Sequence, residues 1–263
     1  CSFGHTLARM WRRLCAATWS GGTSASAMTS SNGSPFLSVI LPVLNEAETV
    51  TRQLMALRVF RERGAELVLV DGGSSDGTPA LAAPEVDQLI VSARGRAMQM
   101  NAGALASQGQ VLLFLHADTA LPLAADDLIR RAITTGACWG RFDVRIDGRQ
   151  PLLRVVERMM NWRSRLTGIA TGDQAIFVRR EVFETVGGYP ELPLMEDIAL
   201  SKRLKRLARP ACLRQRVVTS ARRWQKHGVL RTILLMWCLR ARYFLGADPQ
   251  QLAILYGYAP RQR

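Results

Sequence analysis

The sequence predicts an α/β protein built on a doubly wound, mostly parallel sheet, and three observations support this. Between residues 38 and 115, short apolar runs rich in β-branched side chains alternate with segments of helical periodicity. This order of strands and helices indicates parallel strands joined by right-handed crossovers. The runs are apolar throughout, which is typical of strands that are covered on both faces of a sheet.

The first half of the chain supplies these elements in regular order. Strands are expected at 38–44 (SVILPVL), 66–70 (ELVLV), 88–91 (QLIV) and 111–115 (VLLFL). A helix at 46–61 should follow the first strand, because its apolar residues recur at three- and four-residue steps. A short helix should join the second strand to the third, and a longer helix at 96–107 should join the third to the fourth.

The second half is less regular. An edge strand is expected at 138–146, a helix at 152–166, a strand at 174–178, and helices at 195–207 and 221–245. No repeat or internal linker interrupts the chain. We therefore expect one catalytic domain over 36–220, with 221–263 as an amphipathic helical extension packed on it.

Residues 1–35 are expected to lie outside this fold. They contain no acidic residue and are rich in Ser, Thr, Gly and Ala. Because residue 1 is not Met and Met28 offers a later start, a disordered or non-native leader is the preferred interpretation. An arginine- and serine-rich transit peptide is the alternative.

The charge and the cysteines limit the function classes. The formal net charge is +14, and nearly all of the 35 basic residues are arginine, which suits phosphate-bearing partners such as nucleotides and acidic lipids. A compositional bias explains the same numbers equally well. The five cysteines form no C-x-x-C pair, so we do not expect a zinc ribbon. Their sparse, odd number favours a reducing compartment. No apolar stretch reaches the roughly 18 residues of a membrane span, so we expect a cytoplasmic protein or one peripheral to the inner face of the plasma membrane.

Polar residues follow each expected strand, at the edge where parallel sheets bind ligands. They are Asn45 and Glu46, then Asp71 to Thr78, then Arg94 to Arg96, and finally His116 to Thr119. The turn at 72–77 lacks the lysine of a P-loop and is no G-x-G-x-x-G dinucleotide fingerprint. His116 excludes an aspartyl-phosphate nucleophile at its position. Asp118 with His116 instead predicts a site for Mg²⁺ or Mn²⁺, completed by substrate phosphates; a plain turn cap is the alternative.

Five segments in this order resemble the family 2 glycosyltransferases of the GT-A fold. They are SVILPVLNE (38–46), VDGGSSDGT (70–78), RGRAMQMN (94–101), FLHADT (114–119) and the pair Glu196-Asp197. More narrowly, they are similar to the bacterial branch called transferase 2, rSAM/selenodomain-associated. The resemblance covers the chain from about Ser38 to its C-terminus. It implies an inverting transfer from a nucleotide-diphosphate sugar, UDP- or GDP-linked, to a hydroxyl acceptor.

The resemblance also implies roles for single residues. Asp118 would bind the metal, with His116 in the first acidic place of the family's D-x-D motif. Asp71 would bind the base, and Asp197 would be the general base with Glu196 beside it. Without the resemblance, two acids at a helix N-terminus have a purely structural explanation. The expected nucleotide-sugar site further includes Pro42, Asn45, Glu46, Gly73, Arg94, Arg96, Asn101, Ala117, Asp173, Arg223 and Trp224.

Two other function classes fit less well. A sugar-nucleotide nucleotidyltransferase would need a basic glycine-rich turn after the first strand, where Pro42 to Glu46 stand instead. A basic, non-enzymatic protein that binds membranes or nucleic acid would not need acids at the strand ends, and no nucleic-acid partner is expected. The C-terminal helix combines apolar residues with Arg231, Arg240 and Arg242. It is expected to pack on the domain; binding to an anionic membrane, with a lipid-linked acceptor, is the alternative.

Overall fold

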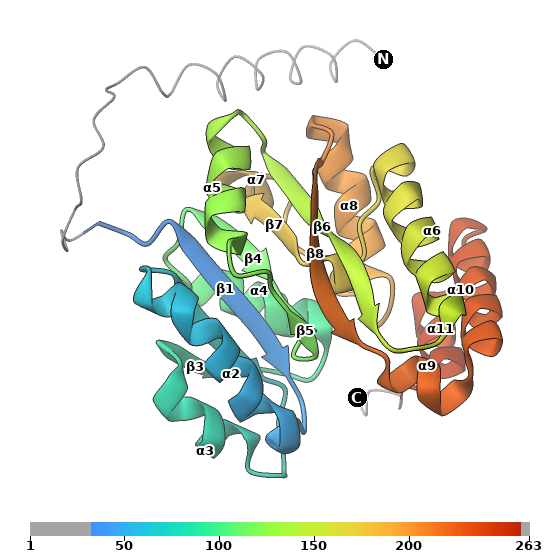
Figure 1. Ribbon diagram of the computed structural model, residues 1–263, viewed down its shortest axis with the longest axis horizontal. Helices are drawn as coiled ribbons and strands as arrows, with labels where there is room; N and C mark the ends of the chain where they lie inside the picture. The colour runs from blue at the N-terminus through green and yellow to red at the C-terminus, as the bar shows by residue number, and fades with distance from the viewer. Residues whose placement is uncertain (1–32, 259–263) are drawn as a thin grey trace.

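Apolar runs form the centre of a mixed sheet. The computed structural model describes residues 33–258, which form one eight-stranded sheet of order β3-β2-β1-β4-β7-β6-β8-β5 (Figure 1). β1, β2, β3 and β4 are parallel, whereas β7 runs antiparallel to both β4 and β6. The strands are β1 (Leu37–Val43), β2 (Glu66–Asp71), β3 (Gln88–Val91), β4 (Val111–Phe114), β5 (Thr119–Ala120), β6 (Trp139–Asp147), β7 (Ile176–Arg179) and β8 (Ala211–Ser220).

Helices cover both faces of the sheet, as the unbroken apolar strands predict. One apolar cluster joins Val39 and Leu41 of β1 to Leu54 of α2 and Ile129 of α5. A second cluster, on the other face, joins Ile40 of β1 to helices α4, α7 and α8. The helices are α2 (Ala47–Glu62), α3 (Thr78–Ala82), α4 (Arg96–Ala106), α5 (Ala125–Thr134), α6 (Pro151–Thr167), α7 (Arg180–Thr185) and α8 (Glu196–Leu207), with short 3-10 turns η1 (Ala83–Glu85) and η2 (Gly172–Gln174).

Three expectations about the fold are wrong in part. The strand at 138–146 was expected at an edge, but β6 lies between β7 and β8, because the long strand β8 extends the sheet beyond it. β3 is an edge strand, and it leaves Val91 69% exposed instead of buried. The single helix expected at 221–245 is broken at Gly228, whose φ of 79° lies in the left-handed region that favours glycine.

The C-terminal helices therefore form three pieces: α9 (Arg222–His227), α10 (Val229–Phe244) and α11 (Pro249–Tyr256). α10 and α11 pack together against the start of α8, around Leu239, Leu252 and Ile198. Val156 of α6 and Val229 of α10 also share one apolar cluster. Within the described residues, no helix combines the length and apolar composition that a bilayer span needs.

Candidate functional site

A cavity of about 970 Å³ opens at the carboxyl ends of β1 and β4. This size is within the range of sites for small organic ligands. Its walls come from the ends of three strands and from two later segments, the loop before α8 and the helix α11. The sheet thus forms the floor of the cavity, and the C-terminal helices close one side.

Many residues predicted from the strand ends line this cavity. They are Pro42, Glu46, Arg94, Arg96, His116, Ala117 and Asp118. Arg94 and Arg96 are basic, and Glu46 and Asp118 are acidic, so the cavity has groups that can bind anions and groups that can bind cations. Removal from water would by itself lower the pKa of Arg96, but the nearby Tyr258 and Glu196 raise it above the ordinary value. Arg96 therefore stays positively charged on the cavity wall.

The glycine-rich loop after β2 lies beside the cavity without lining it. Asp71 is buried, and its carboxylate accepts hydrogen bonds from the backbone N–H groups of Gly73 and Ser74, both at 2.9 Å, and from the Ser74 hydroxyl at 2.5 Å. Asn45 is tied to the same loop, because its Oδ1 accepts a hydrogen bond from the backbone of Ser75 at 2.9 Å. The oxygens of Asp71 are therefore engaged in shaping the loop.

Asp76 joins this loop to two helices. Its Oδ1 accepts hydrogen bonds from the backbone and hydroxyl of Thr78 at the start of α3, and its Oδ2 accepts one from the backbone of Ala47 at the start of α2. These hydrogen bonds, with the one from the Thr78 side chain first, hold the pKa of Asp76 below its ordinary value. Asp76 therefore fixes this loop against the first residues of both helices.

His116 is held between the loop after β4 and the turn η2. Its Nδ1 lies 3.5 Å from the Asp173 carboxylate, which is half-exposed. Its ring also packs so closely against Gly172 that a Cβ at that position would overlap the ring. Burial acts to raise the pKa of Asp173, but the hydrogen bond and charge of His116 outweigh it, and the pKa is lowered. Asp173 therefore reaches the site through His116, not as a member of the cavity wall.

Glu196 and Asp197 begin α8, behind this pair. The Oδ2 of Asp197 accepts a hydrogen bond from the backbone N–H of Gly172 at 2.8 Å, which ties the helix to the turn η2. Glu196 is buried, and this burial together with the charge of Asp197 raises the pKa of Glu196 to about 7. Neither side chain belongs to the cavity wall, but Arg96 and His116 are close enough to lower the pKa of Glu196.

Arg163 of α6 brings an uncompensated positive charge to the same region. Its Nε and Nη2 atoms are buried and have no hydrogen-bond partner within the part of the chain that the structure describes. Burial and the nearby Arg240 lower the pKa of Arg163 to about 10, although Asp197 acts in the opposite direction. The two arginines and Asp197 therefore lie within electrostatic range of one another.

Three predicted site residues have structural contacts instead. The side-chain amide of Asn101 bonds both backbone groups of Tyr189, at 2.9 Å each. Arg223 donates to the carbonyl of Tyr256 at 2.8 Å and stacks on its ring. Trp224 packs in the apolar cluster between α6 and α10.

Arg222, the neighbour of the predicted Arg223, is the arginine that reaches the acids of the site. It lies 3.4 Å from Glu46 and 4.0 Å from Asp118. Other cavity residues were not predicted. Met98 and Gln99 belong to α4, Glu191 and Pro193 to the loop before α8, and Gln250, Ala253, Ile254 and Tyr258 to α11 and the residues after it.

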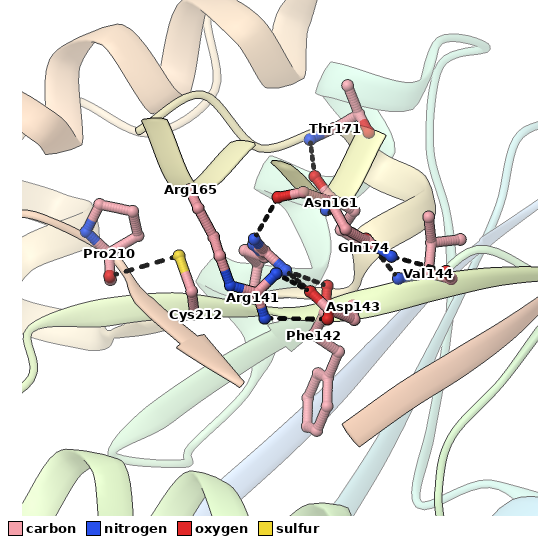
Figure 2. Close-up of polar contacts among 10 residues, drawn as sticks. All are labelled: Arg141, Phe142, Asp143, Val144, Asn161, Arg165, Thr171, Gln174, Pro210 and Cys212. Atoms are coloured by element: carbon pink, nitrogen blue, oxygen red, sulfur yellow. Dashed lines mark hydrogen bonds and ion pairs between the residues drawn. The ribbon is translucent and has the colours of Figure 1, made fainter. Parts of the chain in front are cut away.

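A buried charge network supports the turn η2 from behind (Figure 2). Arg141 of β6 is fully buried and pairs with Asp143. Arg165 of α6 donates two further hydrogen bonds of 2.9 Å to the Asp143 carboxylate. Asn161 of α6 bonds both backbone groups of Val144, and its Oδ1 also accepts from Gln174. The network thus connects β6, α6 and η2.

A divalent metal fits this site when the ligand supplies part of its coordination sphere. Among residues 33–258, no group of three His, Cys, Asp or Glu side chains could hold a metal ion alone. Asp118 is one-third exposed and lines the cavity, so its carboxylate is accessible. Mg²⁺ and Mn²⁺ are commonly held by one or two carboxylates together with substrate phosphates. His116 has its Nδ1 directed at Asp173, a contact that commonly orients a histidine whose Nε2 binds a metal, so His116 remains a candidate second ligand beside Asp118.

Comparison with known proteins shows the family to which the chain belongs. The domain described as Glycosyl transferase family 2 matches residues 38–187. A PGL/p-HBAD biosynthesis glycosyltransferase of Mycobacterium bovis is 34% identical over 170 residues, covering 59% of this chain and 63% of the relative. Glycosyltransferase AglE of Haloferax volcanii is 36% identical over 93 residues, covering 32% of this chain and 31% of the relative. The matches therefore span less than two thirds of either relative.

The sheet and its helices also match solved structures. A mannosyltransferase, PcManGT from Pyrobaculum calidifontis in complex with GDP-Man and Mn²⁺, has a TM-score of 0.56 at 20% identity. The match covers 98% of this chain and 75% of that one. At this identity the likeness concerns the fold, which is the GT-A fold expected from the sequence.

Proposed function

Because the chain belongs to glycosyl transferase family 2, we propose that it transfers a sugar from a UDP- or GDP-linked donor to a hydroxyl acceptor with inversion. The observation that carries this proposal is the cavity at the sheet edge. It presents the accessible carboxylate of Asp118 together with Arg94 and Arg96 in a volume suited to a nucleotide sugar. The His116-Ala117-Asp118 sequence supports placement in the rSAM/selenodomain-associated branch.

The donor would lie along the strand ends. Pro42 and Glu46 would border the nucleoside. Asp71 would act mainly by shaping the loop next to the base, which contains Gly73 and is bonded to Asn45. Arg94 and Arg96 would neutralise the diphosphate, since guanidinium groups pair well with phosphate oxygens. Asp118 would hold Mg²⁺ or Mn²⁺ with the diphosphate. When bound, this ion stabilises the charge that develops on the leaving group.

The acceptor would approach from the side of α8. In this proposal Asp197 removes the proton of the acceptor hydroxyl while the hydroxyl oxygen attacks the anomeric carbon of the donor sugar. The nucleoside diphosphate leaves from the opposite face of that carbon. The hydrogen bond from Gly172 fixes one oxygen of Asp197 and orients the carboxylate. Asp173 positions His116, and the unpaired Arg163 offers a contact for a negatively charged acceptor.

Metal-linked nucleotide binding is the most direct test. Calorimetric titration with UDP and with GDP should show binding of one of them that strengthens at least tenfold when Mn²⁺ is present. Asp118→Asn should abolish this gain, while Asp127→Asn, which changes an exposed acid of α5, should keep it. Binding of neither nucleotide, with or without metal, would refute the donor site. Metal-dependent binding that Asp118→Asn leaves intact would refute the ligand role of Asp118.

A further inference from the structure

Two neighbouring helices, α6 and α10, expose stripes of large apolar side chains. On α6 the exposed residues recur at steps of three and four, so they form one stripe along the helix: Leu152, Val155, Met159, Trp162 and Leu166. α10 and the residue after it repeat the pattern with Leu230, Leu234, Trp237, Phe244 and Leu245. Trp162 and Trp237 are 60% and 61% exposed. Such long exposed stripes indicate a binding surface.

The two stripes belong to one surface, because α6 and α10 lie side by side and run in the same direction (Figure 1). Val156 of α6 and Val229 of α10 belong to one apolar cluster, and further along Arg163 lies within electrostatic range of Arg240. We call the line along which the two helices lie side by side, from Val156 and Val229 to Arg163 and Arg240, the seam. On each helix the exposed stripe lies next to the residues of this seam. We name the surface formed by the two stripes the α6–α10 face.

The exposed charges within helices α6, α9 and α10 are all positive. Helices α6, α9 and α10 contain a single acid, Glu157, which is buried and pairs with Arg154. The exposed charged residues on these helices are basic: Arg158, Arg165, Arg222, Lys226, Arg231 and Arg242. Arg165 and Arg222 have acidic partners, Asp143 and Glu46, whereas Arg158 and Arg231 are exposed beside the stripes.

From these features we propose that the α6–α10 face docks on the surface of an anionic lipid bilayer. Apolar side chains with tryptophan would enter the boundary between head groups and acyl chains, while the arginines would contact the lipid phosphates. A second copy of the chain fits poorly, because two such faces would bring arginine against arginine, and helices α6, α9 and α10 offer no exposed acid to pair with them. This inference builds on the proposed sugar transfer. Binding to the bilayer would bring lipid-linked acceptors close to Arg163, at the end of the seam between α6 and α10.

Vesicle flotation tests this proposal with the full chain. The protein should float with vesicles of phosphatidylglycerol and phosphatidylcholine, and at least tenfold less with pure phosphatidylcholine. Trp162→Ala with Trp237→Ala should weaken binding to the anionic vesicles at least tenfold. Leu105→Ala with Leu123→Ala, which removes apolar side chains that are 88% and 74% exposed elsewhere, should have no effect. Binding to neither type of vesicle would overturn the proposal.

Charge reversals separate docking by this face from general attraction of a basic protein. Arg158→Glu with Arg231→Glu should weaken vesicle binding at least fivefold more than Arg206→Glu with Arg214→Glu, which makes the same change in net charge on α8 and β8. Equal losses in the two variants would overturn docking by this face. So would a dimer in sedimentation that the double tryptophan variant dissociates. All variants should bind the nucleotide unchanged, so failure here is distinct from failure of the donor site.

Discussion

The two halves of the candidate site are held in different ways. In the first half, the Asp71 carboxylate is held by hydrogen bonds from its neighbours Gly73 and Ser74, and Asn45 and Ala47 add bonds to the same loop. In the second half, the turn η2 is fixed by groups far apart in sequence. Gly172 bonds to Asp197, and the network behind it joins β6 to α6 through Arg141 and Asp143 (Figure 2).

This difference has an energetic consequence. Each bond of the local loop is one of several that hold the same short segment, so the loss of one leaves the others in place. The buried network contains a guanidinium that is removed from water, and removal of its partner leaves an uncompensated charge. We therefore expect the second half to be more sensitive to single substitutions, both in catalysis and in stability.

The largest effect is expected for Asp197→Asn. The variant keeps an oxygen that can accept the bond from Gly172 but loses the ability to take a proton. Turnover should fall about 10² to 10⁴-fold, the usual contribution of a general base. Donor affinity in a calorimetric titration should stay within a factor of two. Glu184→Gln, on an exposed position of α7, is the control. A variant with unchanged turnover would remove Asp197 from the reaction.

Asp143→Asn should cause the next largest effect, on stability. It removes the negative charge shared by Arg141 and Arg165 and leaves the buried Arg141 without a counter-charge. The free energy of unfolding, measured with urea, should fall by about 3 kcal/mol. Glu62→Gln, in an exposed pair with Arg58, should change it by less than about 0.5 kcal/mol. Equal effects in the two variants would mean that the network contributes no more than a surface ion pair.

A pH dependence should arise from Glu196. Its pKa is raised to about 7, against an ordinary value of 4.5, because burial and Asp197 disfavour its charged form. Below pH 4.5 the group is protonated in both folded and unfolded chains. Between pH 4.5 and 7 only the unfolded chain releases the proton, so stability should fall as pH rises through this window.

Glu196→Gln should remove this part of the pH dependence. Urea unfolding at pH 5 and pH 8 should show a loss in the parent protein that exceeds the loss in the variant by about 2 kcal/mol. Asp197→Asn should reduce the same difference, since the charge of Asp197 contributes to the shift. Parallel stability curves for the parent and Glu196→Gln would show that Glu196 ionises normally in the folded protein.

The sequence predicted the first half well because strands buried on both faces leave an unmistakable apolar run. The bounds expected for β1, β2 and β4, which are buried along their whole length, agree with the structure to within one residue. The strand-end rule then located Arg94, Arg96 and Asp118, which line the cavity. No contact distant in sequence was needed to place these residues.

The second half was harder because its elements depend on distant partners. β8 was missed since its middle residues, Arg214 to Arg216, are polar and exposed and interrupt any apolar pattern. Gln250 and Tyr258 reach the cavity only because Leu252 and Ala253 of α11 are buried in the cluster with α8 and α10. Arg222 instead of Arg223 reaches the site because α9 begins at Arg222, directly after β8.

The smallest effect is expected for Asp71→Asn, which makes the same chemical change as Asp143→Asn in the locally held half. The amide oxygen can still accept the bonds from Gly73 and Ser74, and the Ser74 hydroxyl, which already accepts from Asn45, can reorient. The free energy of unfolding should therefore fall by only about 1 kcal/mol. If urea unfolding showed a loss as large as that of Asp143→Asn, the contrast between local and distant support would be wrong. A small loss of stability with a tenfold loss of nucleotide affinity would instead show that Asp71 acts on the ligand as well as on its loop.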